Sequence, residues 1–64
     1  INDNNMIAEA VKHVIDENPQ AVVDYHNGKD RAVGFLVGQV MKKTAGKANP
    51  AIVSKLVIEE LKRR

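Results

Sequence analysis

The sequence of 64 residues contains no cysteine and no tryptophan, and only one tyrosine and one phenylalanine. Without cysteine, neither a disulfide nor a thiolate metal site can stabilise the fold, so stability must come from packing alone. A domain of this size buries only about 60% of the surface that its unfolded chain exposes, and its core is therefore thin. Two aromatic rings are also too few for a protein that stacks successive bases of a single strand.

Long apolar segments and targeting signals are absent as well. No run approaches the ~20 apolar residues of a membrane span, and no segment resembles a signal peptide. The lack of cysteine suits a cytoplasmic protein, although it suits many others equally, and no membrane partner is expected. The chain begins at Ile1 rather than at methionine, so we expect a fragment of a longer protein. Residues 1–5 are predicted to be a linker remnant and residues 6–64 a single domain.

Acidic residues are missing from a long central segment. Residues 1–30 contain six acidic residues against two basic ones, whereas residues 31–64 contain eight basic residues against two acidic ones. Between Arg31 and Ile58 there is no acidic residue at all. This asymmetry indicates a polyanionic partner, although the same charges also suit an ordinary solvated surface.

The apolar residues recur with the period of α-helices, and no segment alternates as a strand does. Helices are predicted over residues 6–17, 19–27, 29–45 and 50–62. Asn4 or Asn5 is expected to cap the first helix. Asn18-Pro19 is expected to end that helix and to open the second, and Asn49-Pro50 to cap and open the fourth. Gly46 is expected at the C′ position of the third helix. The fold class is therefore all-α, a bundle of three to four short helices without a sheet, in which the fourth helix should be the most buried.

The third helix is predicted to have two different faces. Its apolar face comprises Val33, Leu36, Val37, Val40, Met41 and Thr44. Its other face carries Arg31, Phe35, Gly38 and Lys42. Gly34 and Gly38 each cost a helix interior about 1 kcal/mol relative to alanine, so a close neighbour should offset that cost. Three neighbours fit: another helix of the bundle with Phe35 buried against it, a nucleic-acid backbone, or a partner domain.

The turn from Gly46 to Pro50 is a candidate anion site, because Lys47 precedes a helix N-terminus and Lys42 and Lys43 lie one turn back. It fits equally well as a capped turn between helices. A phosphate-binding loop is excluded by the spacing and by Ala48, which stands where serine or threonine is required. No pair of acids is placed for acid–base catalysis, and His13 and His26 lack further metal ligands at suitable spacing. We therefore expect no catalytic residue and no metal site.

The segment from Asn18 to Val53 carries a run of landmarks: Asn18-Pro19, Tyr25, Gly28-Lys29, Gly34 to Lys42, and Gly46 to Pro50. In these residues the chain resembles the C-terminal tail domain of the B subunit of bacterial and organellar aminoacyl-tRNA amidotransferases. That domain is shared with stand-alone YqeY-type proteins. With weaker matches on either side, the resemblance covers nearly the whole chain.

The resemblance implies a function in translation. The parent enzyme is a carbon–nitrogen ligase of A, B and C subunits that converts Glu-tRNA(Gln) to Gln-tRNA(Gln), and often Asp-tRNA(Asn) to Asn-tRNA(Asn). It uses glutamine-derived ammonia, with ATP and Mg²⁺ bound in the large N-terminal part of the B subunit, so this fragment is expected to hold no cofactor. The implied role of the tail is to recognise tRNA(Gln) or tRNA(Asn) by the outer corner, on the side of the D-loop.

The resemblance also implies which residues face the RNA: Gly34, Gly38, Gln39, Lys42, Gly46 and Lys47. Lys29, Arg31 and Lys43 are added on charge alone. If Phe35 is buried, this face must move toward Lys43 and the turn. The alternatives are a helical protein-interaction module, a duplex-DNA-binding domain, and a structural tail without direct RNA contact.

Overall fold

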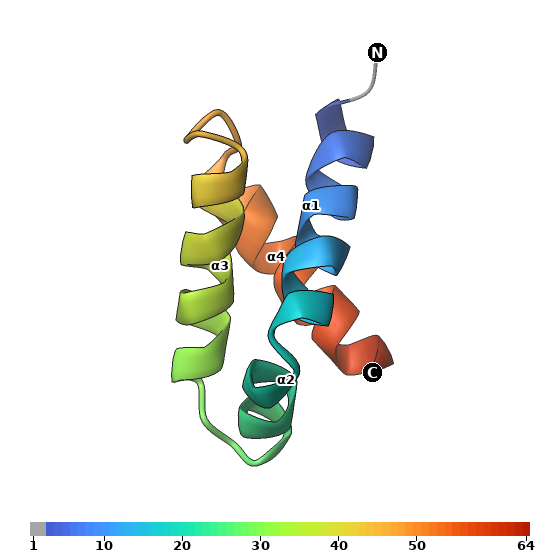
Figure 1. Cartoon of the computed structure of the whole chain (residues 1–64), viewed down its shortest axis with the longest axis vertical. Helices are drawn as coiled ribbons and strands as arrows, with labels where there is room; N and C mark the ends of the chain where they lie inside the picture. The colour runs from blue at the N-terminus through green and yellow to red at the C-terminus, as the bar shows by residue number, and fades with distance from the viewer. Residues whose placement is uncertain (1–2) are drawn as a thin grey trace.

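The computed structural model describes residues 3–64, and within them the chain forms four helices and no strand: α1 (Asp3–Glu17), α2 (Pro19–His26), α3 (Arg31–Lys43) and α4 (Pro50–Arg63) (Figure 1). The prediction of an all-α bundle is confirmed. The first helix begins at Asp3, three residues before its predicted start, so Asn5 lies inside α1 rather than at its cap. Residues 1 and 2 of the predicted linker lie outside the described residues.

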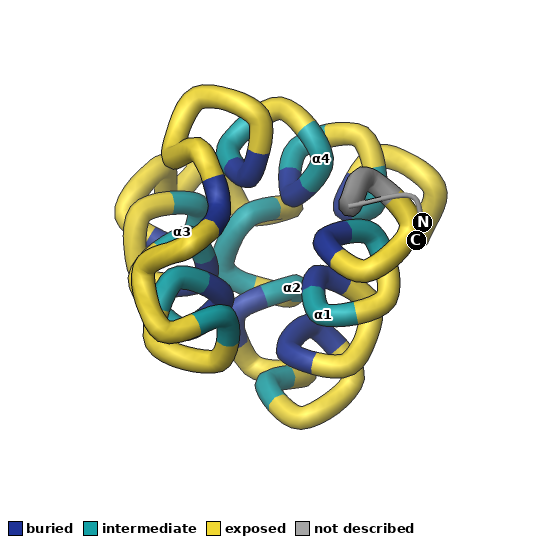
Figure 2. The backbone as a smooth tube through the Cα atoms, turned by 90° about the horizontal axis from the view of Figure 1, so that it is seen from above, coloured by how far each residue is buried: buried dark blue, intermediate teal, exposed yellow. Residues whose placement is uncertain are grey.

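The core lies between α1, α3 and α4, whose buried sides face one another, while the opposite sides are exposed (Figure 2). Leu36 and Val40 on α3 are fully buried, which confirms the predicted apolar face. The prediction that α4 is the most buried helix is wrong. Ile52 on α4 is 40% exposed, and α4 has three buried residues, whereas α1 has four. In so small a bundle each helix has only one inward side, so a wide apolar surface is not fully covered.

The helix α2 contributes least to the core. It is eight residues long, its buried residue is Ala21, and it packs mainly against α3. Val22 and Tyr25 are half-buried as the sequence suggests, but Val23 is 51% exposed. The two Asn-Pro pairs also differ. Asn49 accepts a hydrogen bond from the backbone N–H of Ala51 (2.8 Å) and caps α4 as predicted.

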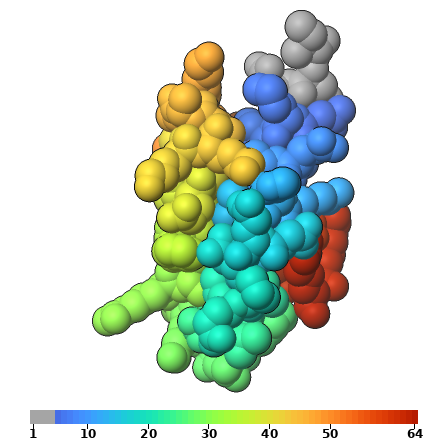
Figure 3. Space-filling model, in the orientation of Figure 1, coloured from blue at the N-terminus to red at the C-terminus, as the bar shows by residue number. Residues whose placement is uncertain are grey.

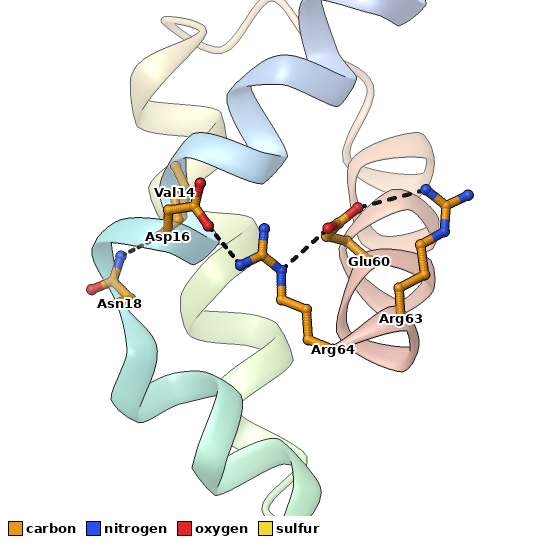
Figure 4. A network of polar contacts seen from close by, with 6 residues as sticks. All are labelled: Val14, Asp16, Asn18, Glu60, Arg63 and Arg64. Carbon is orange, nitrogen blue, oxygen red and sulfur yellow. Dashed lines mark hydrogen bonds and ion pairs between the residues drawn. The ribbon is translucent and has the colours of Figure 1, made fainter.

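Asn18, by contrast, makes no side-chain cap at the start of α2. Its Nδ2 donates to the carbonyl of Val14 (2.8 Å), so it terminates α1 instead (Figure 4). The following proline still starts α2, because its fixed φ suits the first helical position and its missing N–H costs nothing there. The prediction that Asn18-Pro19 ends the first helix and opens the second is therefore confirmed, with the asparagine closing α1 and the proline starting α2.

Both remaining turns close the preceding helix by a Schellman motif. After α2, Gly28 adopts a φ of +91°, and the N–H of Lys29 reaches back to the carbonyl of Asp24 (2.9 Å). After α3, the left-handed C′ residue is Ala45 (φ +56°) and not Gly46 as predicted. Gly46 (φ +74°) follows it and donates to the carbonyl of Met41 (2.8 Å). Two successive left-handed residues set the direction in which α4 leaves the turn.

A cluster of ion pairs joins the end of α4 to the last turn of α1 (Figure 4). Arg64 donates to Asp16 across the interface and to Glu60 one turn back, and Arg63 lies 3.8 Å from the same glutamate. The hydrogen bond to Asp16 is the main cause that raises the pKa of the Arg64 guanidinium above its ordinary value, and Glu60 adds to it. Because the guanidinium stays protonated up to this raised pKa, alkaline pH removes its contribution to stability only as the pH rises through the folded value.

Candidate nucleic-acid interface

The exposed side of α3 forms the candidate interface, and in the space-filling view this helix runs along one edge of the molecule (Figure 3). Arg31, Phe35 and Lys42 are exposed, as their place opposite the apolar face predicts. Phe35 is 49% exposed, so the alternative in which it is buried against another helix of the bundle is wrong. The RNA-facing surface therefore has no reason to move away from Arg31.

Gly34 and Gly38 lie open on this same side. A Cβ built on either residue meets nothing within 4 Å among the described residues. This removes the first proposed neighbour of the glycines, a helix of the same bundle. Gly28 and Gly46 are different, because both hold positive φ values that L-residues rarely adopt. Gly28 and Gly46 are thus required by the backbone conformation of the turns, whereas neither backbone conformation nor packing among the described residues requires glycine at positions 34 and 38.

The positive charges are spread along α3, which at thirteen residues is about 20 Å long. Lys29 lies in the turn before the helix and Lys47 in the turn after it, so these two stand at opposite ends of the face. Arg31 and Lys42 lie on the exposed side between them, without an ion pair among the described residues. Lys43 points toward α1, where its Nζ is 3.9 Å from Glu17.

The turn from Gly46 to Pro50 is only partly suited to an anion. Gly46 and Lys47 are exposed, and Lys42 and Lys43 end the preceding helix as expected. However, the Asn49 side chain already takes the N–H of Ala51, so one of the donors at the start of α4 is occupied. Gln39 is half-buried and lies with Lys42, Lys43 and Glu17 around a shallow depression between α1 and α3. Glu17 brings a negative charge to this depression, and Asp24 and Asp30 lie near Arg31 at the other end of the helix.

Sequence reasoning missed one feature, a cavity of about 470 Å³ where α1 ends, α2 begins and the first half of α3 passes. Its lining residues are Glu17, Asn18, Pro19, Gln20, Ala21, Asp24, Arg31, Ala32 and Phe35. These residues come from two segments of the chain, 17–24 and 31–35, and their assembly depends on the packing of α2 against α3. The one signal in the sequence for this cavity was Phe35, an aromatic residue on the same face of the helix as Arg31 and Lys42.

A family model described as the GatB domain matches residues 1–61. The chain belongs to this family. Among its relatives, the B subunit of the aspartyl/glutamyl-tRNA(Asn/Gln) amidotransferase of Lactobacillus helveticus is 58% identical over all 64 residues. The protein of the same name from Clostridium tetani is 63% identical over 60 residues, 94% of this chain. The chain spans 13% of the length of each of these relatives.

Membership of the GatB domain family confirms the resemblance that the landmarks predict. The two histidines add nothing to the candidate interface. His13 and His26 are exposed surface residues, and His13 lies 3.3 Å from Glu17 on the same helix. Residues 3–64 contain no group of acids and histidines arranged for a metal ion, and no helix among them is long and apolar enough to cross a membrane.

Proposed function

We propose that this GatB domain binds folded tRNA through the exposed side of α3 and serves the B subunit of an aspartyl/glutamyl-tRNA(Asn/Gln) amidotransferase. The observation that carries the proposal is the pair of open glycines between Arg31 and Lys42. Without Cβ atoms, the helix backbone can approach a phosphate–sugar chain closely, and the two cations lie within reach of phosphates on either side. The two glycines together destabilise the helix by about 2 kcal/mol relative to alanine, and contact with the RNA backbone would offset this cost.

The charge distribution supports a nucleic acid over a protein partner. No acidic residue occurs on α3, and acidic residues return only at Glu59. RNA duplexes and folded RNAs are recognised largely through shape, phosphates and 2′-hydroxyl groups, which suits a smooth basic helix with a single ring. In this proposal the tRNA(Gln) or tRNA(Asn) corner lies along α3, and the A and C subunits, ATP and Mg²⁺ belong to the rest of the enzyme. The enzyme then acts in the cytoplasm or an organelle.

The test is a titration of the isotope-labelled chain, followed by NMR, with folded tRNA(Gln), a hairpin of equal length and duplex DNA. We expect shifts specific to tRNA at Gly34, Gly38 and Lys42, weakening with salt because phosphate contacts release counterions. Equal shifts with all three titrants would leave only unspecific charge attraction. No shift, or binding that salt does not weaken, would favour the structural or protein-interaction alternative.

A pair of matched variants sharpens this test. Lys42→Gln removes one cation from the proposed surface, whereas Lys12→Gln removes one from the exposed side of α1. The first should lower the affinity for tRNA and reduce the slope of log K against log salt by about one. The second should change neither quantity beyond the general effect of net charge. Equal effects of the two variants would contradict the assignment of the interface to α3.

A further inference from the structure

The cavity beside Phe35 has an apolar floor and a polar rim, and residues at the end of α1, in α2 and in α3 line it. Ala21 and Ala32 are 8% and 6% exposed and form the closed part. The Phe35 ring lines one side and remains half exposed to solvent. This combination offers a flat apolar surface for a planar group that enters from outside.

The hydrogen-bonding groups on the rim are mainly acceptors. Asn18 uses its Nδ2 on the Val14 carbonyl (2.8 Å), so its Oδ1 is the atom left for a ligand. Gln20 donates its Nε2 to Oδ1 of Asp24 (3.1 Å), and because each carboxylate oxygen can accept two hydrogen bonds, both oxygens of Asp24 remain able to accept from a ligand. Glu17 adds a second carboxylate, which also lies beside His13 and Lys43, and Arg31 is the one cation among the lining residues. A ligand must therefore bring donors, and phosphate is disfavoured by the two carboxylates.

From this arrangement we propose that the cavity binds one unstacked base of the RNA, a guanine, whose ring stacks against Phe35 while its N1–H and 2-amino group donate to Asp24. The proposal rests on the function proposed above and names a part of its ligand. Proteins that recognise RNA loops stack splayed bases on aromatic rings or arginine planes and read their Watson–Crick edges. Guanine is the base that presents two adjacent donors on that edge, which one carboxylate can accept together.

The position of the cavity agrees with this assignment. Phe35 lies between Gly34 and Gly38 on the axis of the proposed RNA surface, and Arg31 belongs to both the surface and the cavity. A base that turns out of an RNA lying along α3 would reach the cavity while its own phosphate stays beside Arg31. A protein segment with an apolar anchor is the competing occupant, and the experiment below separates the two.

The first experiment titrates the labelled chain with guanosine 5′-monophosphate, inosine 5′-monophosphate and ribose 5-phosphate. We expect millimolar binding of the guanine nucleotide, with shifts at the amides of Ala21, Ala32 and Phe35. Inosine lacks only the 2-amino group and should bind several-fold more weakly. Ribose 5-phosphate should leave these amides unchanged. Equal shifts with the guanine and inosine nucleotides, or with ribose 5-phosphate, or no shift at tens of millimolar, would overturn the guanine assignment.

The second experiment measures tRNA affinity for Asp24→Asn and, as its control, Asp30→Asn. Both changes remove one negative charge near Arg31, so electrostatics alone predicts a slight gain in affinity for each. Asp24→Asn keeps an acceptor for Gln20, so the fold should survive, which the amide spectrum checks. The lost carboxylate should instead weaken tRNA binding at least about fivefold, as should Phe35→Leu through lost stacking.

These outcomes keep the two proposals apart. If Lys42→Gln weakens tRNA binding but Asp24→Asn and Phe35→Leu do not, the domain binds tRNA and the cavity does not bind a base. If the unchanged chain does not bind tRNA at all, the proposed function fails whatever the nucleotides do. Binding of a peptide but of no nucleotide at the cavity amides would assign it to a protein segment.

Discussion

Replacing Gly34 and Gly38 by alanine should make this domain more stable and a poorer ligand for tRNA. Both glycines lie in the interior of α3, and a Cβ at either site meets nothing within 4 Å. The helix therefore gains the full difference in propensity, about 1 kcal/mol per site and about 2 kcal/mol for the double variant. Since the core of so small a domain rarely supplies more than roughly 3–5 kcal/mol, this gain is large.

Urea unfolding followed by circular dichroism measures the effect. With a slope near 1 kcal/mol per molar, which is typical of small domains, each alanine should raise the midpoint by about 1 M. In thermal unfolding each should raise Tm by about 4–8 °C. A lower midpoint would show that the fold itself fills the space beside these glycines. The same variants should lose tRNA affinity, because the added methyl groups hold the RNA backbone away, and unchanged affinity would refute the role of the glycines in the interface.

Four further substitutions test the turns and the core. Ala45 and Gly46 both hold positive φ values, which glycine adopts at less cost than alanine. Ala45→Gly should therefore raise the free energy of unfolding by about 0.5–1 kcal/mol, and Gly46→Ala should lower it by about 1 kcal/mol or more. In urea unfolding the first variant should raise the midpoint and the second should lower it. Leu36→Ala should cost about 2–5 kcal/mol, since the side chain is fully buried, and should leave the domain largely unfolded by circular dichroism. Asn49→Ala should cost about 1 kcal/mol in the same urea assay through loss of its cap to Ala51, whereas a midpoint unchanged by this substitution would show that the cap contributes nothing.

The parts of the fold that follow from local physics were predictable. Helical periodicity located the buried side of α3, and therefore also its exposed side with Arg31 and Lys42. Asn49 caps because its position before a proline leaves the side chain close to the free N–H groups. The exposure of Phe35 was not decided, since an aromatic residue on a polar face is compatible with both burial and exposure until the neighbouring helices are placed.

Other features depend on where elements meet, and sequence alone does not determine this. Asn18 has donors and acceptors for both of the helices it separates, and only the geometry of the bend selects Val14 as its partner. The carbonyl that closes the last turn of α3 decides whether Ala45 or Gly46 takes the C′ position. In the structure the helix ends one residue earlier than the glycine suggests, so Ala45 takes it. The cavity beside Phe35 was not predictable, because it needs three elements to be brought together.

The hydrogen bond from the Asn18 side chain to the Val14 carbonyl affects which helix of this domain unfolds locally first. Because that side chain secures the end of α1, α2 begins without a side-chain cap and holds its place through one buried alanine and its packing on α3. Segments with few buried contacts exchange their amide hydrogens through local openings that leave the rest of the protein folded. Amides of α2 should therefore exchange with solvent well before those of α1, α3 and α4, and a ligand that seats between α2 and α3 should slow that same fast-exchanging set.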